Sequence, residues 1–111
     1  LVFWWVVDNF LLTNISKKIQ IKKDVFIVLV DTTENTSLQS KLGMKNIFCI
    51  DNDNEVIWQI SVDESDKSSL KDTFMYLDLN NTEELNADTF FGMEYKINVK
   101  TGEAKRTGWH K

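Results

Sequence analysis

The oxygen-rich segment Asp51–Glu55 is the part of this sequence whose residue types and spacing come closest to a chemical site. It reads Asp-Asn-Asp-Asn-Glu, and oxygen ligands at alternate positions are what Ca²⁺ binds in an EF-hand loop. Such a loop also needs glycine at its sixth position and a bidentate glutamate at its twelfth, where this chain has Val56 and Val62. We therefore expect a solvated turn, with no metal or other cofactor.

Residues that act as nucleophiles or general bases are scarce. The single histidine, His110, is second from the end of the sequence, where a side chain is rarely held rigidly enough for acid–base catalysis. The single cysteine, Cys49, lies in an apolar run without a basic neighbour to lower its pKa, and it can form no intrachain disulfide, which fits a reducing cytosol. Zinc needs several Cys or His ligands, and no glycine-rich phosphate loop or Gly-x-Ser-x-Gly motif occurs. The sequence therefore predicts a protein that is not an enzyme.

Size and charge narrow the classes of function further. The chain has 111 residues, 42% of them hydrophobic, so we expect one β-rich domain over residues 1–111, in which 1–7 could be an extension. Its net charge of −4 argues against nucleic acid as a ligand, because phosphate contacts need clustered Lys and Arg. An acidic surface instead favours a basic partner, or serves solubility alone.

The apolar segment Leu1–Val7 is too short to cross a bilayer. No basic stretch precedes it and no small-residue cleavage site follows it, so it does not resemble a signal peptide. Its tryptophans and β-branched residues predict a strand, or a sticky extension of one. We therefore expect a cytoplasmic protein without membrane attachment.

The strongest strand signal is the segment Asn46–Ile60, in which two runs of alternating apolar residues flank a polar turn. This pattern is typical of a β-hairpin. In the first run, Ile47 and Cys49 are expected to point to one side, and Phe48 and Ile50 to the other.

The second run of this hairpin contains the most informative aromatic residue, Trp58. We expect it to share a face with Val56 and Ile60, which indicates core packing. Tryptophan is also enriched among interface hot spots, so an exposed binding anchor is the second interpretation. For Trp109, core-edge packing and an exposed anchor are both open.

Other segments also read as strands. The run Val25–Val30 is apolar throughout, which predicts a strand buried on both faces at the centre of a sheet. Thr73–Leu79 and Phe90–Val99 alternate instead, the first with Met75, Leu77 and Leu79 on one of its faces and the second with one apolar and one polar face. The residues expected to share a face are Phe74 with Tyr76 in the first of these, and Phe91, Met93, Tyr95, Ile97 and Val99 in the second.

Polar segments connect the predicted strands. Ser37–Leu42 is expected to hold a helical turn that ends at Gly43. Ser61–Asp72 is rich in charged residues and reads as a mobile surface loop. Asn80–Asp88 fits either a capped helical turn or a wide turn followed by a short strand.

A second hairpin, Met93–Arg106, repeats the plan of the first. Asn98 stands 47 positions after Asp51, and Gly102 occupies the left-handed position of a G1 bulge. Related hairpins at this period are typical of propeller blades, but 111 residues cannot supply a closed propeller. The sequence therefore predicts a mainly β fold, an antiparallel meander of about seven strands closed as a small barrel or folded as two packed layers.

The segments Asn46–Ile60 and Gly92–Glu103, with Asp8–Asn14 as an opening strand, resemble short bacterial immunity proteins of polymorphic-toxin and contact-dependent growth inhibition systems. The resemblance covers most of the chain from Asp8 onward, although Asn54 stands where the family often has glycine in the first turn. The same hairpins also resemble quinoprotein-type propeller blades. The immunity resemblance implies a cytosolic antitoxin that blocks the active site or substrate groove of one toxin domain.

An acidic antitoxin would suit a basic nuclease, because it could imitate the phosphate backbone. The expected partner is thus a basic toxin domain, with monomer and dimer both open. The competing class is a non-catalytic β-domain for structural or small-ligand binding, related to a propeller-type repeat. The residues expected to contact the partner are Asp51, Asp53, Glu55, Trp58, Asp63, Glu64, Asp66, Glu83, Glu84 and Asp88.

Overall fold

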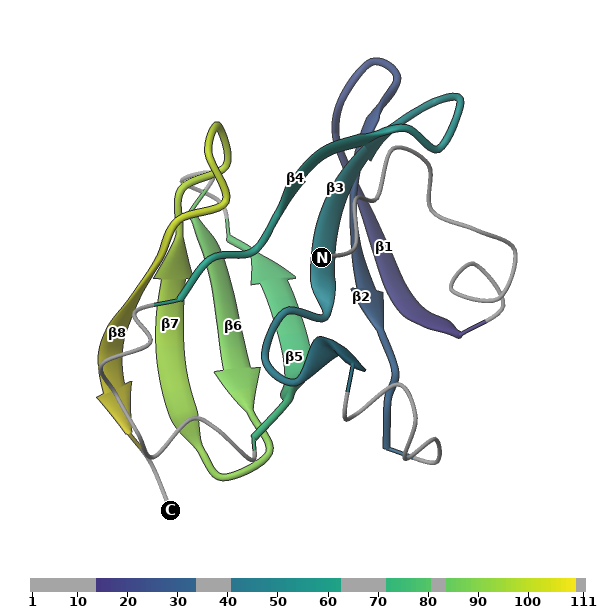
Figure 1. Ribbon diagram of the computed structural model, residues 1–111. Helices are drawn as coiled ribbons and strands as arrows, with labels where there is room; N and C mark the ends of the chain where they lie inside the picture. The colour runs from purple at the N-terminus through teal and green to yellow at the C-terminus, as the bar shows by residue number, and fades with distance from the viewer. Residues whose placement is uncertain (1–13, 34–40, 63–71, 81–83, 110–111) are drawn as a thin grey trace.

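The computed structural model describes residues 14–33, 41–62, 72–80 and 84–109, and it contains two antiparallel four-stranded sheets (Figure 1). Each sheet is a meander in which neighbours in sequence are neighbours in space. The predicted mainly β meander is confirmed, in the form of two layers and not a closed barrel. The strands are β1 (Ile15–Lys22), β2 (Val25–Val30), β3 (Ile47–Asp51), β4 (Val56–Gln59), β5 (Phe74–Leu79), β6 (Leu85–Thr89), β7 (Met93–Ile97) and β8 (Ala104–Trp109).

The first sheet is organised around β2 and β3, which are buried on both faces. Cys49 and Ile47 of β3 face the main core, whereas Phe48 and Ile50 belong to a second apolar cluster on the opposite face. The two-sided burial was predicted for β2 from its continuous apolar run, and for β3 the predicted opposite directions of Ile47 and Cys49 against Phe48 and Ile50 are confirmed. Leu42, in the connection from β2 to β3, also packs in the second cluster.

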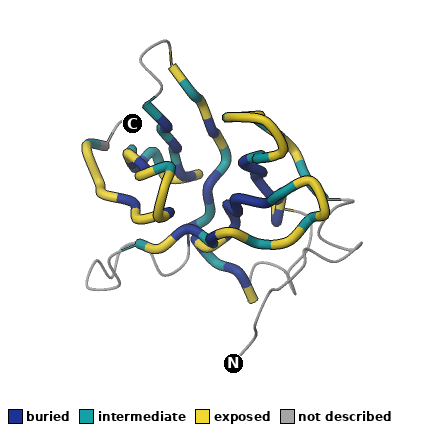
Figure 2. The backbone as a smooth tube through the Cα atoms, turned by 90° about the horizontal axis from the view of Figure 1, so that it is seen from above, coloured by how far each residue is buried: buried dark blue, intermediate teal, exposed yellow. Residues whose placement is uncertain are grey.

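The second sheet has one buried face. In β7, Met93, Tyr95 and Ile97 are buried in the main core, and the residues between them are more exposed. The strand β6 alternates in the same way. Figure 2 shows the buried segments in the interior of the molecule and the exposed ones at the turns and the periphery.

Two register shifts put side chains on other faces of the sheets than the sequence predicted. The pairing of β3 with β4 shifts between Cys49 and Ile50, so that Trp58 packs in the main core while Val56 packs against the second cluster. Trp58 and Val56 therefore do not share a face, because a bulge inserts one extra residue and reverses the alternation. The pairing of β5 with β6 shifts at Phe74 in the same way.

The shift in β5 separates two aromatic residues that were expected to lie together. Phe74 is buried, whereas Tyr76 is 67% exposed on the opposite face of the sheet. The strand predicted from Phe90 begins only at Met93, so Phe91 lies in the preceding turn and is exposed. Of the two interpretations of Asn80–Asp88, the short strand is confirmed as β6.

Buried polar contacts join the two sheets. The Asn46 side chain is fully buried, and its Nδ2 donates to the carbonyl oxygens of Val30 and Phe74, each at 2.9 Å. Its Oδ1 accepts from the Phe74 N–H at 3.1 Å. In Figure 1, β5 accordingly lies in the middle of the molecule, with β1 and β8 at opposite sides.

At the end of the second sheet opposite Phe74, Trp58 of β4 contacts the β7–β8 turn. Its Nε1 donates to the Val99 carbonyl oxygen at 2.9 Å, and its ring covers Gly102, whose φ is +79°. Ser61, just after β4, forms a parallel bridge with Glu103. The left-handed conformation predicted for Gly102 is confirmed.

Several predictions concern segments that the structure describes only in part or not at all. The strand expected over Leu1–Val7 lies outside the described residues, as does most of the loop expected over Ser61–Asp72. Of the helical turn expected over Ser37–Leu42, only Lys41 and Leu42 are described; both are helical, and Gly43 follows with a φ of +53°.

Candidate protein-interaction surface

The β3–β4 turn is built around the carboxylate of Asp51. Its Oδ1 accepts the backbone N–H groups of Asp53 at 2.8 Å and Glu55 at 2.9 Å. Asn54 has a φ of +64°, the left-handed conformation for which glycine is the usual residue. The Asp51 carboxylate thus stabilises the turn, and the exposed acids it leaves on the surface are Asp53 and Glu55.

The β7–β8 turn is likewise stabilised by an Asx side-chain oxygen that accepts a backbone N–H group. The Oδ1 of Asn98 accepts the Lys100 N–H at 2.8 Å, and its carbonyl oxygen accepts the Gly102 N–H at 2.8 Å. Asp51 and Asn98 therefore have equivalent roles in their hairpins, as their spacing predicted. In the described part of the chain, no group of three or more His, Cys, Asp or Glu side chains is placed to hold a metal ion.

Trp58 is a core residue and not an exposed anchor. Only 7% of it is exposed, and its one donor is satisfied by Val99. The packing interpretation is therefore the one that the structure supports, and Trp58 drops out of the expected contact residues. Its energetic role is to join the two sheets.

The remaining predicted acids are spread over the molecule. Glu84, before β6, pairs with Lys96 at 2.8 Å, and this hydrogen bond and charge lower the pKa of Glu84. Asp88 is half-buried in β6. The acids that lie outside the described residues are Asp63, Glu64, Asp66 and Glu83.

The described surface is close to electrically balanced. It carries eleven acidic and ten basic residues, so most of the net charge of −4 lies in the segments that the structure does not describe. In Figure 1 the β3–β4 turn is at the top of the first sheet, whereas the β6–β7 turn, which Asp88 precedes, is at the bottom of the second. The predicted acids therefore do not form one patch, and local arrangement matters more than total charge.

The most exposed large apolar side chains lie on the second sheet and its β6–β7 turn. Phe90 is 65% exposed and Phe91 55% exposed, and their rings meet edge to face with centroids 5.3 Å apart. The turn is fixed by hydrogen bonds from the Phe90 N–H to the Thr73 carbonyl at 2.9 Å and from the Phe91 N–H to the Asp72 carboxylate at 3.3 Å. We name this pair and its backbone the aromatic turn.

Sequence reasoning assigned Phe91 to the core and so missed the aromatic turn. The missed signal was Gly92, which has a φ of +89° and ends the turn just before β7. A glycine after two aromatic residues favours a turn over a continuous strand.

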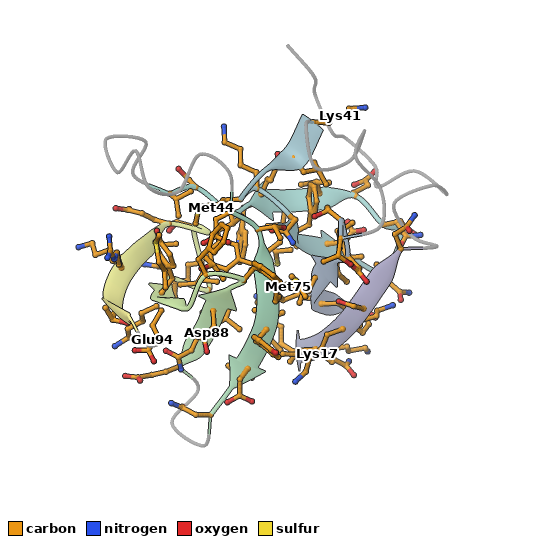
Figure 3. The ribbon with its side chains drawn as sticks, turned by 90° about the horizontal axis from the view of Figure 1, so that it is seen from below. Lys17, Lys41, Met44, Met75, Asp88 and Glu94 are labelled. Atoms are coloured by element: carbon orange, nitrogen blue, oxygen red, sulfur yellow. The ribbon has the colours of Figure 1, made fainter. Side chains whose placement is uncertain are left out.

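The aromatic turn borders the solvent-exposed face of the second sheet, which has a shallow depression of about 310 Å³. Tyr76, Asp88 and Glu94 lie in register on adjacent strands in this depression. Figure 3 shows Asp88 and Glu94 side by side on the second sheet, apart from Lys17 of the first sheet. The depression combines the Tyr76 ring with three carboxylates, those of Asp78, Asp88 and Glu94.

Cys49 lies away from this surface. It is 1% exposed, and burial raises the pKa of its thiol to about 11. At neutral pH it is therefore a protonated thiol in the core, which is not the form that acts as a nucleophile.

The chain matches a known protein family over almost its whole length. The family model described as "Domain of unknown function (DUF7957)" matches residues 10–109. No curated protein and no solved structure matches the chain. Within the described residues, the structure has no helix long and apolar enough to cross a membrane.

Proposed function

We propose that this chain, which belongs to the DUF7957 family, is a cytoplasmic immunity protein that binds and neutralises a bacterial toxin domain. The observation that supports this best is the aromatic turn, where Phe90 and Phe91 are exposed on a fixed backbone next to an acidic sheet face. The toxin domain is basic, most simply a nuclease whose substrate groove the acidic face covers. The protein acts by occlusion and has no catalytic step of its own.

An exposed pair of phenylalanines is well suited to an interface. Aromatic residues dominate interface energetics, because they bury a large apolar area at a small cost in conformational entropy. The hydrogen bonds to Thr73 and Asp72 hold the turn before any partner arrives. Binding then requires little ordering of the backbone, which lowers its entropic cost.

The charged groups near the turn suit a basic partner. Asp88 precedes the aromatic turn and Glu94 follows it, both on the exposed face of the sheet. Asp53 and Glu55 add negative charge at the far end of the first sheet. There they would raise the association rate with a basic partner without contacting it in the complex. Opposite charge across an interface raises the association rate and makes it sensitive to salt.

The proposal is tested by isolating the complex with the product of the gene immediately upstream and by titration calorimetry at two salt concentrations. We expect a one-to-one complex that weakens as salt rises. The double variant Phe90→Ala/Phe91→Ala should weaken it by more than tenfold, since a central aromatic pair of this kind acts as a hot spot at about 2 kcal/mol or more.

The matched control is Ile57→Ala, which removes an equally exposed apolar side chain (51% exposed) from the first sheet. We expect this variant to bind like the wild type. Absence of a complex with the neighbouring protein, or equal losses in the control and in the double variant, would contradict the proposed interface.

A second candidate is a non-catalytic β-domain related to a propeller-type repeat. It is favoured by one observation, namely that both sheets are four-stranded meanders whose last hairpins have equivalent Asx-stabilised turns. Blade-like sheets of this kind would stack with further copies. Sedimentation of the protein at rising concentration separates the two candidates, because the repeat interpretation predicts self-association and the immunity interpretation does not need it.

A further inference from the structure

We propose that Asp72 supplies the negative charge with which the aromatic turn recognises a cationic side chain of the partner. Its carboxylate is buried against the backbone of the turn, and one of its oxygens has no hydrogen-bond partner. The inference rests on the proposed function, which supplies a basic protein partner. It goes further because it names the residue behind the exposed phenylalanines and the kind of group that packs on them.

The Asp72 carboxylate joins the start of β5 to the aromatic turn. Asp72 is only 3% exposed, and its Oδ1 accepts the backbone N–H groups of Thr73 at 2.9 Å and of Phe91 at 3.3 Å. The Phe90 N–H, one residue earlier in the turn, is bonded to the Thr73 carbonyl oxygen at 2.9 Å. The carboxylate therefore lies directly against the backbone that presents Phe90 and Phe91.

The second oxygen of this carboxylate is left unsatisfied. Asp72 Oδ2 is buried and has no hydrogen-bond partner. The hydroxyl of the neighbouring Thr73 is instead paired with the Thr32 hydroxyl of the first sheet at 3.0 Å. Among the residues that the structure describes, no cation forms an ion pair with Asp72. A buried carboxylate that is only half satisfied costs free energy on folding, so it is explained better by binding than by stability.

Elsewhere the chain gives such acceptor positions to a neutral amide or to a solvated carboxylate. Asn46 is fully buried and Asn98 lies in the β7–β8 turn, and each uses its Oδ1 to accept a backbone N–H group. Asp51 accepts two such groups with a carboxylate that is half-exposed. An asparagine at position 72 would offer the same Oδ1 without burying a charge. The charge of Asp72 is therefore the feature that the fold itself does not need.

A negative charge at this position acts on whatever packs on the aromatic turn. Phe90 is 65% exposed and Phe91 55% exposed, and the faces of aromatic rings attract cations. A buried charge acts more strongly at short range than a solvated one, because the effective dielectric constant around it is lower. An aromatic surface backed by such a charge is complementary to a lysine or arginine side chain and disfavours an acidic one.

The direct test measures the charge at the aromatic turn in the free protein. NMR records how strongly the cationic nitroxide aminomethyl-PROXYL and the anionic nitroxide carboxy-PROXYL relax the ring protons of Phe90 and Phe91. We expect stronger relaxation by the cationic probe, and we expect this preference to fall by about half or more in Asp72→Asn. Asp24→Asn removes an exposed carboxylate from the β1–β2 turn and should leave the preference unchanged. Equal relaxation by the two probes in the wild type, or an equal fall in the control, would overturn the proposal.

Two variants separate the charge of Asp72 from its position. Asp72→Asn keeps the Oδ1 acceptor and removes the charge, so its midpoint of thermal unfolding should rise, whereas its complex with the neighbouring protein should weaken by about fivefold or more. Asp72→Ala removes the acceptor as well, so the Phe91 amide should also exchange its hydrogen faster. Asp51→Asn is the stability control, and its midpoint should change little because that carboxylate is half-exposed. A lower midpoint in Asp72→Asn, or unchanged binding by it, would contradict the role assigned to the charge.

The charge at the aromatic turn and the proposed function can fail separately. The nitroxide and unfolding measurements need no toxin, so negative results there refute the role of Asp72 even if a toxin complex is isolated. Conversely, a cation-attracting turn without any complex with the neighbouring protein would refute the immunity assignment and leave a surface that recognises cationic side chains.

Discussion

The two sheets have the same topology but different surroundings. In the first sheet, β2 and β3 are buried on both faces, against the main core on one side and the second apolar cluster on the other. In the second sheet, β6 and β7 are buried on one face and carry polar or charged residues on the other. Strands that are covered on both faces have no free face for a partner, whereas a sheet with one exposed face can bind a partner there.

This difference explains why the candidate surface lies where it does. The depression and the aromatic turn both belong to the second sheet. The first sheet contributes Trp58 and Asn46, which fix the two sheets together. Four comparisons between variants test this division of roles, and they are ordered by the size of the expected effect.

The largest difference is expected between Phe48 and Tyr76, which both lie on the face of their sheet opposite the main core, one of them covered and the other exposed. Phe48→Ala should lower the free energy of unfolding by about 3–5 kcal/mol, because it leaves a cavity in the second cluster. Tyr76→Ala should change it by less than about 0.5 kcal/mol, because that side chain is 67% exposed. Urea denaturation measures both, and similar losses would refute the contrast between a covered and a free face.

The link between the sheets at Asn46 should come next. Asn46→Ala leaves the Val30 and Phe74 carbonyl groups and the Phe74 N–H without their buried partner. Each unsatisfied buried group costs about 1–3 kcal/mol, and with partial relaxation we expect a total loss of about 3 kcal/mol. The exposed amide variant Asn52→Ala is the control, and equal stability of the two variants would show that Asn46 does not join the sheets.

The link at Trp58 is tested by two glycines with similar backbone conformations. A Cβ at Gly102 would lie 2.6 Å from Trp58 Cδ2, whereas a Cβ at Gly43 would meet nothing within 4 Å. Gly43→Ala should cost about 1 kcal/mol from its left-handed φ alone. Gly102→Ala should cost about 2 kcal/mol or more, since overpacking adds to the strain. If thermal unfolding showed the same loss of stability in both variants, the Trp58 ring would have moved aside at no energetic cost, and the contact would not help to join the sheets.

The smallest effect concerns the pH dependence of the ion pair on the exposed face of the second sheet. Lys96 lowers the pKa of Glu84 below its ordinary value of 4.5, so the pair stabilises the folded state above that pH and loses its contribution as the pH falls through the folded pKa. Glu84→Gln should therefore be less stable than the wild type at pH 7 and equally stable at low pH. In a Lys96→Met background the pH-dependent difference should shrink to the part that the Asn80 hydrogen bond to Glu84 leaves, and an undiminished difference there would contradict the pairing.

Much of the framework could be predicted because it depends on local patterns. The runs in Val25–Val30 and Ile47–Ile50 are apolar at every position, which only a strand buried on both faces explains well. The left-handed position of Gly102 was identified from turn chemistry, which is also local. The candidate surface could not be predicted in this way. Phe91 and Tyr76 are as apolar as core residues, and their exposure depends on a turn and a bulge that alternation does not reveal.

The sequence by itself therefore determined most of the strands and the two Asx-stabilised hairpin turns, because those follow from side-chain type and backbone preference over a few residues. Only the tertiary structure decided which faces are covered. Burial depends on how the two sheets pack, and a one-residue register shift moves the side chains beyond it to the opposite face. Asp88, Glu94 and Tyr76 became one row only when three strands were paired in register.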